Sequence, residues 1–175
     1  MTTDTTEISA TVLDSPVGPL TVVASDAGLR AVLWPADGAG GDRPRVPLPG
    51  AVEDDDHAVL VEARRQLTEY FAGERTEFDL PLDPVGTAFQ QSAWTALRTI
   101  TYGETISYGE QARRMGDARK ARAVGAANGK NPLSIVVPCH RVVGSDGSLT
   151  GFAGGVETKA WLLAHERAVS GDTLL

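Results

Sequence analysis

The two halves of this chain carry different secondary-structure signals, and this contrast most limits the folds that it can adopt. The first half holds short runs rich in β-branched residues, which predict strands over 10–13, 20–24 and 29–34. Ser15-Pro16-Val17-Gly18 and Asp26-Ala27-Gly28 separate these runs and are typical of hairpin turns. We therefore expect a short antiparallel sheet at the amino-terminal end of the chain.

One helix is predicted to accompany this sheet. The segment 35–50, rich in proline and glycine, predicts a long loop, and Asp54-Asp55-Asp56 is predicted to cap a helix whose apolar residues recur at helical spacing until Gly73. The prolines in 80–85 indicate a linker. Residues 1–80 are thus expected to form an α/β domain.

The second half is predicted to be helical. Thr87-x-x-Gln90 and Ser107-x-x-Glu110 are capping-box patterns that open two helices, the second ending at Gly116. An alanine-rich, basic helix is expected over 118–128. Two short helices joined by a turn with glycine are typical of a helix-turn-helix. Residues 86–170 are therefore expected to form a mainly helical domain that binds DNA.

Composition narrows the class of protein. Hydrophobic residues make up 42% and charged residues 22% of the 175 residues, as in ordinary globular proteins. No apolar run is long enough to span a bilayer, so a cytoplasmic location is expected. One cysteine cannot form an internal disulfide, and the three histidines lie far apart, so neither a structural metal nor a cofactor is expected.

The formal charge of −7 argues against a nucleic-acid partner until its distribution is considered. Residues 1–92 hold 6 basic and 16 acidic side chains, whereas residues 93–175 hold 10 basic and 7 acidic ones. The segment 111–145 holds seven basic residues and one acidic residue. This basic segment brackets the only cysteine and indicates a surface that can meet phosphates, although such a charge run is also common on a merely solvated face.

Cys139 stands in the sequence Val136-Val137-Pro138-Cys139-His140-Arg141-Val142. A cysteine is nucleophilic as the thiolate, which an adjacent imidazole and nearby positive charge favour. A lone cysteine is otherwise a small core hydrophobe. The flanking His140 and Arg141 favour the reactive interpretation.

In an ordered set of motifs the chain resembles the O6-alkylguanine-DNA alkyltransferases, the methylated-DNA–protein-cysteine methyltransferase family. The motifs are 14–20, Phe89-Gln90, Tyr102-Gly103-Glu104-Thr105-Ile106-Ser107-Tyr108-Gly109, Arg122-Ala123-Val124-Gly125, Asn131-Pro132, Pro138-Cys139-His140-Arg141-Val142 and 162–166. The resemblance implies an α/β protein of two domains. The first is ribonuclease H-like, with a short antiparallel sheet plus helix, and the second is mainly helical with a helix-turn-helix.

The resemblance also implies the chemistry. Cys139 takes the alkyl group from O6 of guanine, His140 receives the thiol proton through a water molecule, and Glu166 orients the imidazole. Asn131 matches a hinge asparagine that braces the active-site segment. The product is a thioether, which offers water no electrophilic carbonyl, so each molecule reacts once.

The target base must leave the stack of double-stranded DNA. By resemblance, Arg122 fills the gap and Tyr108 crowds the phosphate and meets the flipped purine. We infer from the residues alone that the small side chains of the basic helix allow close approach to the minor groove and that three basic residues contact phosphates. The small residues are Ala123, Gly125, Ala126 and Ala127, and the basic ones Arg113, Arg114 and Lys130.

Four residues are expected to line the base pocket by resemblance. Val142 and Ala153 match positions that contact guanine through the main chain. Phe152 stands where the human family member has tyrosine, which removes a hydroxyl. Ser134 stands where it has proline, so we expect a looser pocket wall that captures bulky benzyl groups less well.

Two other functions remain open. A non-catalytic sensor of alkyl lesions would share the DNA-binding residues but lack the nucleophile, and a thiol hydrolase would need no basic helix. His57 and His165 are predicted to be structural, and Trp34, Trp94 and Trp161 to pack in cores. We expect a monomer in solution, with clustering of several copies on DNA left open.

Overall fold

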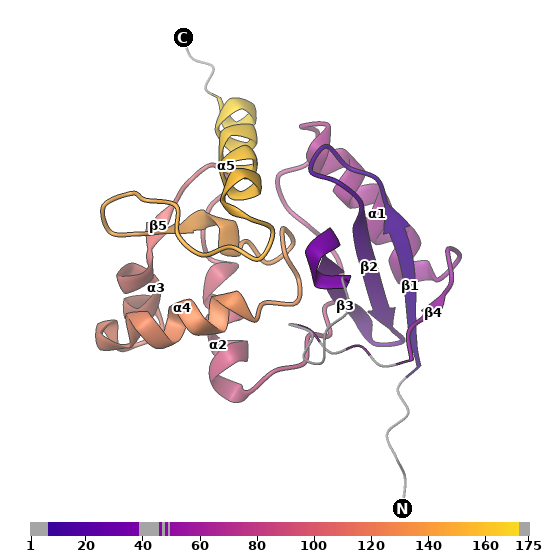
Figure 1. The fold of residues 1–175 in the computed structure, drawn as a ribbon, viewed down its shortest axis with the longest axis horizontal. Coiled ribbons are helices and arrows are strands. Elements are labelled where there is room, and N and C mark those ends of the chain that lie inside the picture. Colours follow the sequence, from indigo (N-terminus) through magenta and orange to yellow (C-terminus); the bar gives the residue numbers. More distant parts are fainter. Residues whose placement is uncertain (1–6, 39–45, 47, 49, 172–175) are drawn as a thin grey trace, which may run out of the picture. The chain divides into compact units, whose positions relative to one another are not determined.

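The computed structural model describes residues 7–38, 46, 48 and 50–171, and the chain forms two compact units, Met1–Pro84 and Val85–Leu175. Figure 1 colours the first unit from indigo to magenta and the second from pink to yellow. The first combines a sheet with an α-helix, and the second is mainly helical, as predicted.

The sheet of the first unit has the order β3-β2-β1-β4. Its elements are β1 (Ile8–Leu13), β2 (Leu20–Ser25), β3 (Gly28–Leu33) and β4 (Val52–Glu53), with a 3₁₀ turn, η1 (Pro35–Gly38), after β3. β1, β2 and β3 pair antiparallel, which confirms the three predicted strands. β4 pairs parallel with β1, so the sheet is mixed rather than wholly antiparallel. The predicted loop contains η1 and lies partly outside the described residues.

Helix α1 (Ala58–Phe71) covers one face of this sheet (Figure 1) and buries Leu60, Leu67 and Tyr70. It ends before Gly73, which has a φ of 78°, as predicted. The predicted aspartate cap is wrong, because Nδ1 of His57 accepts the hydrogen bond from the Val59 amide at 3.2 Å. Asp55 instead accepts a 2.6 Å hydrogen bond from the Thr11 hydroxyl, which ties this segment to β1.

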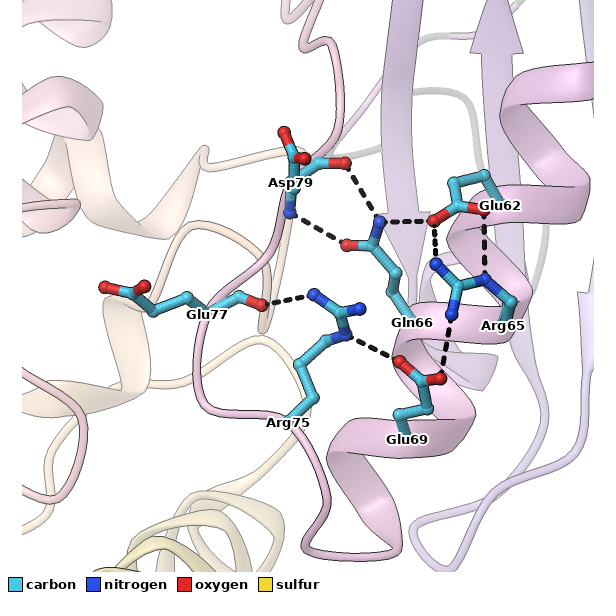
Figure 2. Close-up of polar contacts among 7 residues, drawn as sticks. All are labelled: Glu62, Arg65, Gln66, Glu69, Arg75, Glu77 and Asp79. Atoms are coloured by element: carbon cyan, nitrogen blue, oxygen red, sulfur yellow. Dashed lines mark hydrogen bonds and ion pairs between the residues drawn. The ribbon is translucent and has the colours of Figure 1, made fainter.

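A polar clasp joins α1 to the segment that follows it (Figure 2). The amide of Gln66 donates to the Asp79 carbonyl at 2.9 Å and accepts from the Asp79 N–H at 2.8 Å. Arg75 donates to Glu69 at 2.8 Å. The chain then runs beside β3, where Leu29 N–H donates to the Pro81 carbonyl at 2.7 Å and Asp83 N–H to the Leu29 carbonyl at 2.8 Å. The clasp therefore holds 79–83, most of the predicted linker, on the first unit.

The second unit contains four α-helices within its described residues. They are α2 (Ala88–Leu97), α3 (Tyr108–Arg114), α4 (Ala121–Gly129) and α5 (Val156–Ser170). Thr87 and Gln90 form the predicted capping box of α2. Ser107 caps α3, accepting from the Glu110 N–H at 3.0 Å, whereas the Glu110 carboxylate pairs with arginines of its own helix.

The predicted basic helix over 118–128 is two elements rather than one. Ala118–Lys120 forms a 3₁₀ turn, η2, and α4 begins at Ala121. The Asp117 carboxylate caps the short turn by accepting from the Arg119 N–H at 3.0 Å, and the break lies at Lys120, whose φ of −92° and ψ of 17° are not helical.

Buried amide side chains fix α2, α3 and α4 against one another. Gln111 of α3 and Asn128 of α4 exchange hydrogen bonds of 3.0 and 2.8 Å, and Gln111 also donates to the Ala93 carbonyl at 3.1 Å. The Trp94 indole donates to the Ala127 carbonyl at 2.9 Å. Since an unpaired buried amide costs about 1–3 kcal/mol, these bonds specify how the helix-turn-helix of α3 and α4 packs.

A second, two-stranded sheet links the start of α3 to the segment after the cysteine. β5 (Ile106–Ser107) pairs parallel with β6 (Val142–Val143). Between α4 and β6 lies a 3₁₀ turn, η3 (Cys139–Arg141), which contacts α5. The helix-turn-helix, the cysteine and α5 are thereby held in one unit.

Candidate active site

Two γ-turns bring the chain to Cys139. The first is closed by a 2.9 Å hydrogen bond from the Val136 N–H to the Ser134 carbonyl, with a φ of 74° at the central Ile135. A positive φ is strained for a β-branched residue. The second is an inverse γ-turn, with Pro138 at φ −83° and ψ 67° and a 2.8 Å bond from the Cys139 N–H to the Val137 carbonyl. The cysteine therefore follows a tightly folded, strained segment.

Asn131 braces this segment. Its amide donates to the Val137 carbonyl at 2.8 Å and accepts from the Leu133 N–H at 2.9 Å, and it is buried. Its own N–H donates to the Asn128 carbonyl, at 3.1 Å, in the last turn of α4. Asn131 thus connects the helix-turn-helix to the turn that carries the thiol.

His140 and Glu166 form a buried pair beside Cys139. Nε2 of His140 lies 2.7 Å from Oε2 of Glu166, and both side chains have essentially no exposure. Cys139 itself is partly exposed, and it forms no disulfide. Since the carboxylate can only accept, Nε2 carries the proton and Nδ1 of the neutral ring holds the lone pair. Nδ1 has no hydrogen-bond partner among the described residues.

Burial and charge set the protonation of this pair. Burial lowers the pKa of His140 below its ordinary 6.5, and the charges of Arg141 and Lys159 lower it further against the opposing effect of Glu166. Burial would raise the pKa of Glu166, but hydrogen bonds from His140 and Arg141 hold it well below its ordinary value. The resting site therefore combines a neutral imidazole, able to take a proton, with an ionised carboxylate.

Two cations of this site were not among the predicted site residues. Arg141 binds Glu166 through Nε at 2.7 Å, and Lys159 of α5 is fully buried, with its ammonium donating to the Thr150 carbonyl at 3.1 Å. Burial lowers the pKa of Lys159, whereas the charge of Cys139 raises it, so the two groups interact. Arg141 stood in the predicted motif, whereas nothing in the sequence around Lys159 marks it as buried.

Predicted pocket residues come from several segments of this unit. Tyr108 begins α3, its hydroxyl donates to the Thr150 carbonyl at 3.3 Å, and its ring centre lies 6.0 Å from Nζ of Lys159. Val142 and Ser134 are buried, and Phe152 and Ala153 lie partly exposed in the turn before α5. Lys159 thus links Tyr108 to the thiol electrostatically.

Helix α4 has one buried face and one exposed face. Val124, Ala127 and Asn128 are buried against the unit. Arg122, Ala123 and Ala126 are exposed, and Gly125 is partly exposed beside the Tyr108 ring. Of the predicted small residues, only Ala127 therefore belongs to the core. Arg122 makes no ion pair with any residue that the structure describes.

The predicted phosphate contacts differ in their surroundings. Arg113 and Arg114 both bind the carboxylate of Glu110, at 2.7 and 2.9 Å, and they lower its pKa to about 2. Lys130 is exposed at the end of α4. Two of the three cations are thus already paired with an acid.

The residues predicted to be structural have local partners. His57 caps α1, and His165 stacks on Trp161 with ring centres 4.9 Å apart. Trp34 and Trp94 are buried. In the described segments, no three metal-binding side chains gather into a site, and no helix is both long and apolar enough to cross a bilayer.

Comparison with known proteins gives matches along nearly the whole chain. Residues 8–84 match the ribonuclease-like domain, and residues 88–168 the DNA binding domain, of 6-O-methylguanine DNA methyltransferase. The methylated-DNA–protein-cysteine methyltransferase of Mycolicibacterium paratuberculosis is 48% identical over 168 residues, covering 93% of this chain and 94% of the relative. That of Methanosarcina acetivorans is 44% identical over 156 residues, covering 89% and 96%. The solved structure of Mycobacterium tuberculosis OGT in complex with DNA matches with a TM-score of 0.81 at 44% identity, covering 93% of this chain and 94% of that one.

Proposed function

Since this chain belongs to the 6-O-methylguanine DNA methyltransferase family and is a methylated-DNA–protein-cysteine methyltransferase, we propose that Cys139 is the cysteine that accepts the alkyl group. The protein binds DNA and repairs it by moving an alkyl group onto itself. The observation that carries the assignment is the only thiol of the chain, next to a buried His–Glu pair.

The transfer is an in-line displacement. The sulfur of Cys139 forms a bond to the alkyl carbon as the bond from that carbon to O6 of guanine breaks, and the electron pair of that bond stays on the base. The thiol proton passes through a water molecule to Nδ1 of His140, which is the basic nitrogen because Nε2 is bonded to Glu166. Glu166 stabilises the resulting imidazolium. Lys159 favours the thiolate.

The reaction ends with the protein modified. The S-alkyl cysteine is a thioether, which water cannot hydrolyse under mild conditions, so one molecule removes one lesion. Asn131 keeps the cysteine segment in place through its bonds to Leu133 and Val137.

Access to O6 requires the nucleotide to leave the stack. The exposed Arg122 and the small exposed residues of α4 support insertion of this helix into the minor groove, with Arg122 in the gap. Tyr108 would exchange its bond to Thr150 for one to the flipped purine, in a pocket with Val142, Ala153, Ser134 and Phe152. Lys130, Arg113 and Arg114 would bind phosphates.

The two units take different roles in this proposal. Residues 86–170 form the domain for DNA binding and alkyl transfer, and residues 1–80 a scaffold whose acidic charge disfavours DNA. The protein would act as a monomer in the cytoplasm, where a reducing environment preserves a single reactive thiol.

The proposal is tested by mixing the protein with an oligonucleotide duplex that contains O6-methylguanine and mapping the product by peptide mass spectrometry. We expect one methyl group per protein, on the peptide with Cys139, and none in Cys139→Ala. Many turnovers would favour a thiol hydrolase, and tight binding of the lesion without transfer would favour a lesion sensor. Methylation of another residue would reject Cys139 as the acceptor.

The role of Arg122 is tested separately with two substrates. Because flipping costs a few kcal/mol, Arg122→Ala should slow transfer from duplex DNA by about tenfold or more. Transfer from the alkylated base alone, which needs no flipping, should keep the parental rate. An equal loss on both substrates would contradict a role in flipping.

A further inference from the structure

We propose that Arg141 is a positioning residue that keeps His140 neutral by sharing the carboxylate of Glu166. This inference rests on the proposed function, since it concerns the group that receives the thiol proton. It assigns to Arg141 an influence on the pH dependence of the reaction, beyond a contribution to folding.

Arg141 binds Glu166 through two parallel hydrogen bonds. Nε donates to Oε1 at 2.7 Å and Nη2 to Oε2 at 3.1 Å, and the arginine is only 7% exposed. Oε2 is the same oxygen that accepts from His140 at 2.7 Å. The planar guanidinium therefore fixes the carboxylate plane and the direction in which the carboxylate meets the imidazole.

The guanidinium is itself held from two sides. Nη1 donates to the Ile100 carbonyl at 2.9 Å, just after α2, and the group lies 5.4 Å from the centre of the Tyr102 ring. Arg141, Glu166, Ile100 and Tyr102 all belong to the second unit, and Arg141 directly follows His140 in η3. Arg141 cannot move away from the pair without breaking buried contacts.

The charges around His140 divide into two sets. Glu166, on α5, favours the imidazolium, whereas Arg141, on η3, and Lys159, on α5, disfavour it. Cys139, also on η3, supplies a negative charge only as the thiolate, and the Tyr102 phenol is uncharged near neutral pH, since burial raises its pKa further above the ordinary 10. An isolated buried carboxylate beside histidine would draw a proton onto the ring in the resting protein. Burial is the largest cause that lowers the pKa of His140, and Arg141 adds to it by offsetting that carboxylate, so Nδ1 can still accept the thiol proton.

This proposal predicts a shifted pH profile when the charge of Arg141 is removed. In Arg141→Gln, Glu166 should hold a proton on His140 to higher pH, so the acid limb of the single-turnover rate should move up by about one pH unit. On the acid limb this lowers the rate by about tenfold, and raising the pH should restore much of it. Arg141→Lys retains the charge but not the paired bonds, so its acid limb should stay near the parental one.

The control is Arg167→Gln, which removes an exposed arginine from the same helix as Glu166 and should leave the profile unchanged. An Arg141→Gln protein that is slower at every pH, with an unmoved acid limb, would overturn the proposal. A limb that moves as far in Arg141→Lys as in Arg141→Gln would overturn it as well.

Arg141→Gln leaves Glu166 buried without its main partner and can fail to fold. In that case ¹⁵N NMR of His140 in the parent protein decides, since the proposal requires a neutral ring protonated at Nε2 at pH 6.5. An imidazolium at that pH would overturn it. A parent protein that transfers no methyl group would instead reject the proposed function, which separates the two failures.

Discussion

A buried ammonium group has no neutralising acid among the contacts that hold it in this site. Lys159 is fully buried and hydrogen-bonds to the Thr150 carbonyl, and its charge interacts with Cys139. Burying an uncompensated charge is costly, so the arrangement favours an anion nearby. In the proposed mechanism the thiolate of Cys139 supplies this anion, although Lys159 lies far from Cys139 in the sequence.

Replacing Lys159 with methionine should make Cys139 less reactive near neutral pH. Without the positive charge the thiolate is less stable. The pH at which the rate of reaction with iodoacetamide reaches half of its maximum should therefore rise by about one unit. The measurement is the rate of carboxamidomethylation of Cys139 by mass spectrometry across pH. Lys120→Met, the same change at an exposed position on η2, should leave the profile unchanged. A profile in Lys159→Met equal to the parental one would contradict this role.

At the scale of elements, the turn before the cysteine stores strain in one residue. Ile135 is buried and has a φ of 74°, the single positive φ outside glycine among the described residues. Such a conformation persists only where surrounding bonds impose it, and here Asn131 and the backbone bond from Val137 N–H to the Leu133 carbonyl, at 2.8 Å, do so.

A comparison of glycine with alanine at position 135 separates the backbone strain from the loss of side-chain packing. Both substitutions remove the side chain, but glycine accepts a positive φ without strain, so Ile135→Gly should be more stable than Ile135→Ala by about 1 kcal/mol. At Val137, where φ is not positive, the order should reverse. Chemical denaturation of the four variants measures both differences. The same order at the two positions would show that the turn is not strained.

The polar clasp on α1 should also contribute to the stability of the first unit. Gln66→Leu keeps the apolar stem but leaves the N–H and carbonyl of Asp79 without their side-chain partner, so the first unit should lose about 1–3 kcal/mol of stability. Glu74→Gln, a change of one exposed side chain just after the same helix, should cost less. Urea unfolding followed by near-ultraviolet absorption reports both. Equal losses of stability would mean that the hydrogen bonds of the Gln66 amide do not stabilise the first unit.

The sequence predicted those features of the fold that depend on residues close together in the chain. The three strands, the capping box at Thr87 and the ends of α1 and α3 follow from turn and cap residues within a few positions. β4, β5 and β6 have two residues each, and their pairings, β4 with β1 and β5 with β6, join segments far apart in the chain that no local pattern marks. Lys159 was not predicted for the same reason, because its burial depends on Thr150 and Tyr108, which are distant in the sequence or unmarked by any pattern. Cys139 and His140, in contrast, are adjacent in a recognisable motif.

At the scale of the whole molecule, an acidic protein must bind a polyanion. The formal charge is −7, and the excess acid lies in residues 1–92, so we expect affinity for DNA to depend on a few cations of the second unit. Glu110 engages two of these, Arg113 and Arg114, through one carboxylate. Under the proposed function, Glu110 therefore weakens the electrostatic attraction of the helix-turn-helix for DNA.

Removing this restraint should strengthen binding to any DNA sequence. In Glu110→Gln one negative charge is lost and the two arginines are released toward phosphates, so the dissociation constant for undamaged duplex should fall. The slope of log K against log salt should steepen by about one to two, because each added phosphate contact contributes about 0.9. Fluorescence anisotropy between low and moderate salt measures both quantities. Glu74→Gln makes the same charge change in the first unit and should leave the slope unchanged, since Glu110, not Glu74, holds Arg113 and Arg114. A slope in Glu110→Gln equal to that of the parent would mean that Arg113 and Arg114 do not meet phosphates, and would leave Arg122 and Lys130 as the cations on which binding depends.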